Sequence, residues 1–84
     1  KTHPLFEKDI RKLTKLERKR LSRILSKIKE NPTRYRKLKK FKNCYRVRIG
    51  NLRVVYILKG EIIWIVIVGK REKVYREMKK RIDK

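Results

Sequence analysis

The sequence predicts a single α+β domain in which an N-terminal pair of helices packs against an antiparallel sheet and a further helix ends the chain. Three observations support this class: apolar residues recur at helical spacing before residue 31, alternate with basic residues after residue 44, and return to helical spacing after residue 71. Leu, Ile, Val and Phe together exceed the roughly 20% of residues below which chains tend to stay unfolded. With 84 residues, the chain has room for one domain, residues 1–84.

Two helices are expected before residue 32. Proline suits the first turn of a helix because its φ is already fixed there, and Pro4 is followed by apolar residues at helical spacing. Thr14 and Glu17 form the pattern of a capping box, so a second helix is expected to begin at this point. That helix is expected to end at Asn31-Pro32, since the ring of a proline disfavours helical geometry in the residue before it. Two helices joined at Thr14 would form an αα-hairpin.

A three-stranded antiparallel meander is expected next. Apolar residues alternate with arginines over Tyr45–Ile49, which indicates a half-buried strand. Gly50-Asn51 is typical of a two-residue hairpin turn, so the second strand is expected over Leu52–Leu58. Lys59-Gly60 turns the chain again. The third strand, Glu61–Val68, is apolar on both faces and is therefore expected to be central in the sheet.

The C-terminal helix and a fourth strand complete the predicted fold. Helical spacing resumes at Arg71, and Val74, Met78 and Ile82 follow at intervals of four. A central third strand needs a neighbour on each edge. The chain also begins at Lys1 rather than at a methionine, so we expect an N-terminal strand that includes residues before Lys1.

The composition excludes several classes of function. The chain has 29 Lys and Arg against 8 Asp and Glu, a net charge of +21, so a nucleic acid is the first partner expected and an acidic protein the second. No apolar run approaches the roughly 20 residues that cross a bilayer, so no membrane association is expected. A lone Cys44 supports no internal disulfide, which favours the cytoplasm, and Cys44 with His3 cannot form a Cys/His zinc site. The sequence has neither a Ser-His-Asp set nor a Gly-rich phosphate loop, and we expect no metal and no cofactor.

The hairpin register brings arginines together. If Gly50-Asn51 fills a two-residue turn, Arg48 lies opposite Arg53, and Arg46 shares their face of the sheet. Like charges directly opposed on a sheet are destabilising, so the three are either well-solvated residues of a basic chain or an anion-binding cluster. Arginine suits the second role because its planar fork fits phosphate. The other end of this face is apolar and requires a cover, either the C-terminal helix or another protein.

Three segments together resemble the RelE/ParE superfamily of toxins from toxin–antitoxin systems, and RelE-type messenger-RNA interferases more closely. They are Asn43–Gly50, Arg53–Tyr56, and Val68–Glu72 with Val74-Tyr75. The resemblance implies the same α+β fold with an N-terminal strand. It also implies a toxin that enters the ribosomal A site and cleaves the messenger RNA there. A RelB-like antitoxin would wrap around and neutralise it, as a heterodimer or a heterotetramer.

The resemblance also places functional positions on this chain. We expect four catalytic residues: Arg48, Arg53, Arg71 and Tyr75. We expect RNA binding by Arg46 and by three lysines of the basic connector Thr33–Asn43: Lys39, Lys40 and Lys42. Family members carry a lysine base on the first meander strand, where this chain has only arginines, and arginine is a poor base. Tyr75 or one of the connector lysines is therefore the expected proton-transfer group.

Two alternatives remain beside the ribonuclease. One is a ParE-like toxin that poisons DNA gyrase by binding it, which Arg53, Arg71 and Tyr75 disfavour because that branch needs no such site. The other is a ribosome- or RNA-binding module without catalysis, which the arginines in place of lysine favour.

Overall fold

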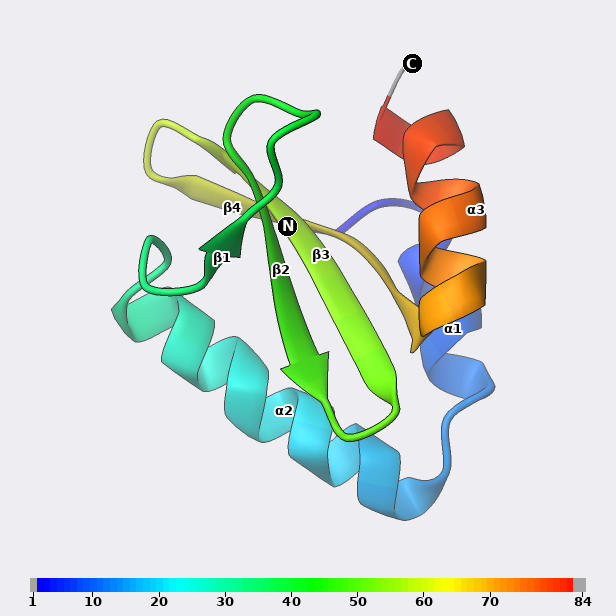
Figure 1. The fold of residues 1–84 in the computed structure, drawn as a ribbon. Helices are drawn as coiled ribbons and strands as arrows, with labels where there is room; N and C mark the ends of the chain where they lie inside the picture. Colours follow the sequence, from blue (N-terminus) through cyan, green and yellow to red (C-terminus); the bar gives the residue numbers. More distant parts are fainter. Residues whose placement is uncertain (1, 83–84) are drawn as a thin grey trace.

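The protein is an α+β fold of helices packed on an antiparallel sheet, as the sequence predicts. The computed structural model describes residues 2–82. The elements are α1 (Phe6–Arg11), α2 (Lys15–Glu30), β1 (Arg36–Lys37), β2 (Cys44–Ile49), β3 (Leu52–Lys59), β4 (Ile62–Lys70) and α3 (Arg71–Ile82). The four strands form one antiparallel sheet in the order β1-β2-β3-β4. Figure 1 shows α2 running along one side of the sheet, and α1 and α3 near the end of β4.

The predicted capping box begins α2. The Thr14 hydroxyl accepts a hydrogen bond from the Glu17 amide at 3.1 Å, and the Glu17 carboxylate accepts one from the Thr14 amide at 2.8 Å. These bonds satisfy amides that have no partner within the helix, and they fix the start of α2. The helix ends at Glu30, directly before the predicted Asn31-Pro32 stop. The Tyr56 hydroxyl donates to the Pro32 carbonyl oxygen at 2.5 Å, which ties this end to the sheet.

The predicted hairpin register is confirmed. Ile49 pairs with Leu52, and Arg48 pairs with Arg53 across the two strands. Gly50 has a φ of 56°, in the left-handed region that glycine adopts without steric cost. The hairpin turn therefore sets which side chains face the helices and which face away.

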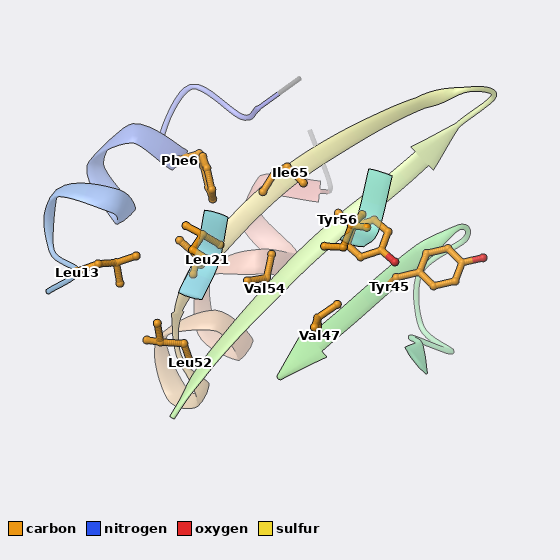
Figure 2. Packing of buried hydrophobic residues seen from close by; sticks show 11 residues of the cluster. Phe6, Leu13, Leu21, Tyr45, Val47, Leu52, Val54, Tyr56 and Ile65 are labelled. Atoms are coloured by element: carbon orange, nitrogen blue, oxygen red, sulfur yellow. The ribbon is translucent and has the colours of Figure 1, made fainter. Parts of the chain in front are cut away.

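The sheet separates two hydrophobic clusters. On the face covered by α1 and α2, residues of β2 and β3 at period two pack against helical residues (Figure 2). The buried members are Phe6, Leu13, Leu21, Ile28, Tyr45, Val47, Leu52, Val54, Tyr56, Ile65 and Val68. The other face holds a second buried cluster: Cys44, Val55, Val66, Ile67, Val74 and Met78. Since Val74 and Met78 belong to α3, the C-terminal helix covers the apolar end of this face, one of the two covers expected.

The edges of the sheet differ from the prediction. The fourth strand is β1, a two-residue strand within the basic connector that pairs Arg36 with Arg46. At the N-terminus, the described residues contribute a single parallel bridge between Thr2 and Ile65 in place of a strand. β4 therefore lies at the end of the strand order and not at its centre, and Thr2 and His3 pair with Ile65 on its other edge. Its apolar character on both faces arises because α1 packs on one face and α3 on the other.

Candidate functional site

An arginine of β2 meets an arginine and a tyrosine of α3, from a distant part of the chain. The guanidinium carbon of Arg46, on β2, lies over the Tyr75 ring at 5.7 Å from its centroid. That of Arg71, at the start of α3, lies over the same ring at 5.6 Å. Both distances allow cation–π attraction, which holds the two charges near each other. Tyr75 is still 37% exposed, so the group formed by Arg46, Arg71 and Tyr75 remains open to a ligand.

Two further arginines lie at the tip of the β2–β3 hairpin. The Nε atom of Arg48 donates to the Gly50 carbonyl oxygen at 3.3 Å. The Nη1 atom of Arg53 donates to the same oxygen at 3.4 Å and to the Leu52 carbonyl oxygen at 3.1 Å. Arg20 of α2 approaches the same tip: its Nη1 atom would lie 3.5 Å from a Cβ atom added to Gly50. The hairpin tip is therefore surrounded by guanidinium groups from two strands and a helix.

Electrostatics link these two groups of arginines. Burial lowers the pKa of Arg46 below its ordinary value, and the positive charges of Arg36, Arg53 and Arg71 lower it further. Arg46 is thus close enough to all three to be destabilised in its charged form. Within residues 2–82, no carboxylate forms an ion pair with Arg46, Arg53 or Arg71. We call Arg36, Arg46, Arg48, Arg53, Arg71 and Tyr75 the arginine cluster; an anion bound there would relieve its mutual repulsion.

The connector lysines are only partly brought to this site. Lys39 and Lys40 line a hollow of about 380 Å³ beside Tyr75. Its other lining residues are Leu38, Phe41, Met78 and Lys79. Lys42 is exposed in the same connector but is not among the residues that line the hollow. The structure therefore places two of the three predicted lysines next to the arginine cluster, and the roles of all three stay predictions.

Arg36 and Arg20 are the residues near the site that the sequence does not single out. Arg36 reaches the cluster because β1 pairs it with Arg46, and a two-residue strand carries no alternation from which it could be recognised. Arg20 is one of many cations on the exposed side of α2, so its approach to Gly50 has no local signal.

The described residues contain neither a metal-binding cluster nor a membrane-spanning helix. Among residues 2–82, no three His, Cys, Asp or Glu side chains lie close enough together to hold a metal ion. None of the helices formed by these residues is both long enough and apolar enough to span a bilayer.

Comparison with known proteins gives one family model and several solved structures. Residues 1–75 match the model described as the ParE toxin of the type II toxin–antitoxin system parDE. The free form of an Escherichia coli RelE toxin mutant, in which two arginines are replaced by alanine, is 31% identical with a TM-score of 0.82. That match covers 96% of this chain and 93% of that chain. No curated protein matches the chain.

Two of the similar structures are complexes of RelE toxins with their antitoxins. The same E. coli mutant bound to a peptide of the antitoxin RelB is 28% identical, with a TM-score of 0.75, and the match covers 90% of this chain and 87% of that chain. The RelB–RelE antitoxin–toxin complex from Methanococcus jannaschii is 26% identical, with a TM-score of 0.76, and the match covers 89% of this chain and 94% of that chain. The family model thus bears the ParE name, whereas these solved structures are RelE toxins.

Proposed function

Because the chain belongs to the RelE/ParE family of toxins from type II toxin–antitoxin systems, we propose that it inhibits translation by cleaving messenger RNA in the ribosomal A site. The observation that carries this proposal is the arginine cluster. Its guanidinium groups repel one another around Arg46 and have no carboxylate partner within residues 2–82. The planar fork of a guanidinium group binds phosphate oxygens through two parallel hydrogen bonds.

The proposed reaction is a transesterification within the RNA. The 2′-oxygen attacks the adjacent phosphorus, and the bond from phosphorus to the 5′-oxygen breaks. The products are a 2′,3′-cyclic phosphate and a free 5′-hydroxyl. The negative charge that develops on the phosphorus oxygens is stabilised by fixed cations, which Arg46, Arg48, Arg53 and Arg71 supply.

Proton transfer is assigned to residues other than arginine. One group must accept the proton of the 2′-hydroxyl and another must donate a proton to the departing 5′-oxygen, and arginine stays protonated in proteins. The candidates are Tyr75, within the cluster, and the two lysines of the hollow beside it, Lys39 and Lys40. Such a group typically contributes about 10²–10⁴ in rate. The rest of the acceleration is assigned to alignment of the messenger RNA by the ribosome.

A RelB-like antitoxin is the proposed protein partner. Two of the similar structures are RelE toxins in complex with RelB or a RelB peptide. At a net charge of +21, this chain suits an acidic partner. We propose a heterodimer with such an antitoxin, or two heterodimers paired, in the cytoplasm.

A ParE-like toxin is the second candidate, because the matching family model carries the ParE name. Such a toxin would poison DNA gyrase by binding it, and it would not need Tyr75 beside Arg46 and Arg71. The arginine cluster therefore favours the ribonuclease.

Mapping of message ends in cells that express the toxin separates these functions. The ribonuclease predicts new 5′ ends inside translated reading frames, in step with the codons, and their loss with Arg71→Ala. Arg23→Gln is the matched control, since Arg23 is exposed on α2 outside the arginine cluster. DNA damage without message cuts would replace the proposal with the gyrase function, and growth arrest with neither would leave a non-catalytic binding module.

A further inference from the structure

Asp9 on α1 holds a buried ionic network. It is 2% exposed and is the one polar or charged residue of residues 2–82 that is buried in the core. Its Oδ1 atom accepts hydrogen bonds from Lys73 Nζ at 2.9 Å and from Arg81 Nη2 at 3.1 Å. Its Oδ2 atom accepts from Arg81 Nη1 at 2.8 Å and from the Val68 amide at 3.2 Å. We call Asp9, Lys73 and Arg81 the ionic clasp.

The ionic clasp lies where α1, the outer edge of β4 and α3 meet. Arg81 Nη1 also donates to the Val66 carbonyl oxygen at 2.9 Å, so the clasp satisfies an amide and a carbonyl of the edge strand. Burial alone would raise the pKa of Asp9, but hydrogen bonds from Arg81, Lys73 and Val68 together lower it below its ordinary value. The carboxylate is therefore charged at neutral pH and attracts both cations.

One carboxylate holds both ends of α3. Lys73 is in the first turn of the helix and Arg81 is in its last turn, so the two contacts fix the rotation of α3 about its axis. Gly69 contributes to this arrangement, because a Cβ atom there would lie 3.1 Å from the Cδ atom of Lys73. Without that atom, the Lys73 side chain can cross the end of β4 to reach Asp9.

The rotation of α3 determines where Tyr75 lies. Tyr75 is two residues beyond Lys73, and its ring must meet Arg46, which belongs to a different element. Side-chain tips lie about 5–6 Å from a helix axis, so a rotation of about 20° would move the ring by about 2 Å. A displacement of about 1 Å at a reacting group can cost about 10²-fold in rate.

We propose that Asp9 is a positioning residue for the RNA-cleaving site, because its contacts with Lys73 and Arg81 place the Tyr75 ring against Arg46 and Arg71. The inference rests on the proposed function for its effect on cleavage, but not for its effect on the ring. Asp9 and Arg81 act only through α3, since Asp9 is buried and the Arg81 side chain is 6% exposed. Neither is accessible to an RNA bound at the arginine cluster.

The test combines a spectroscopic measurement with a rate. In the native protein, the Tyr75 ring is expected to shift the NMR signals of the Arg46 and Arg71 side-chain protons, because both guanidinium groups lie over it, and Y75L gives the unshifted reference. D9N removes the charge of the clasp, while R81K keeps the charge but loses the two-atom contact. E77Q is the matched control, because Glu77 also faces Arg81, at 4.0 Å, but is more exposed and is not bonded to Lys73.

We expect D9N and R81K to move the arginine signals toward the Y75L values and to slow cleavage of ribosome-bound message by about tenfold or more. RNA affinity is expected to change less than about twofold, because the arginines themselves remain. E77Q should keep both the shifts and the rate. If D9N fails to fold, R81K carries the test.

Folded D9N and R81K proteins with native shifts would overturn the proposal. Displaced shifts with a native cleavage rate would overturn the role of the clasp in the reaction. If the native toxin cleaves no message, the proposed function fails, and the NMR comparison still decides whether Asp9 positions Tyr75.

Discussion

Arg48 and Arg53 lie directly opposite each other across the β2–β3 hairpin, and both donate a hydrogen bond to the carbonyl oxygen of Gly50. One neutral oxygen therefore accepts hydrogen bonds from two guanidinium groups. No carboxylate of residues 2–82 forms an ion pair with either of them. Like charges opposed on a sheet are destabilising, so the arrangement costs stability in the absence of a bound anion. Such a cost is expected at a site that binds phosphate.

Replacing one arginine of this pair should lower the cleavage activity without lowering the free energy of unfolding. Arg48→Gln is expected to leave the free energy of unfolding unchanged or to raise it by up to about 1 kcal/mol, since a like-charge contact is lost. Cleavage of ribosome-bound message should fall. Urea unfolding and a cleavage assay check the two effects, with Arg23→Gln as the control. Lower stability together with native cleavage would show that the pair serves the fold.

Tyr75 and Arg71 are expected to affect the rate more than binding. Tyr75→Phe keeps the ring over which Arg46 and Arg71 lie and removes only the hydroxyl. If that hydroxyl transfers a proton, the variant loses about 10²–10⁴ in rate. Arg71→Ala should also slow cleavage more than it weakens binding to ribosomes. Equal losses of rate and affinity would make both residues phosphate anchors.

The salt dependence of RNA affinity measures how many phosphates the protein contacts. Each cation that binds a phosphate of single-stranded RNA contributes about 0.7 to the slope of log affinity against log salt concentration. Replacing Arg53 with glutamine should lower the slope by about that amount, whereas Arg23→Gln should change it much less. Filter binding at several salt concentrations measures both. An unchanged slope for the Arg53 variant would remove it from the phosphate site.

The ionic clasp predicts how stability depends on pH. Asp9 has a lowered pKa in the folded state, so its stabilisation is fully present above the pKa of the unfolded chain and is lost as the pH falls through the folded value. Asp9→Asn should cost about 3–5 kcal/mol at neutral pH, because the largely buried Arg81 guanidinium and the partly buried Lys73 ammonium both lose their partner. Unfolding free energies from neutral pH down to acid should converge for the two proteins. A constant difference across this range would contradict the assignment.

Short-range signals account for the parts of the fold that the sequence predicts correctly. Thr14 and Glu17 are three residues apart, and the capping box needs nothing beyond that spacing. Gly50-Asn51 fixes the hairpin register, and the register alone places Arg48 opposite Arg53. The alternation of apolar and basic residues along the strands also predicts the face that carries Arg46, Arg48 and Arg53, and the apolar end of that face.

The parts that the sequence does not predict depend on distant contacts. Arg36 joins Arg46 through a two-residue strand, which is too short to show a period. Asp9 and Arg81 are 72 positions apart, and nothing near either residue indicates that they meet. The place of β4 at the end of the strand order is also not predictable, because helices on both faces give an edge strand the composition of a central one.

Cleavage of one message, bound to ribosomes or free, by the purified toxin tests the central claim most directly. The account predicts cuts in the A-site codon that leave a 2′,3′-cyclic phosphate and a 5′-hydroxyl, much slower cutting of the free RNA, and loss of cutting with Arg71→Ala. An intact message on the ribosome, or cutting that is equally fast on free RNA, would contradict it.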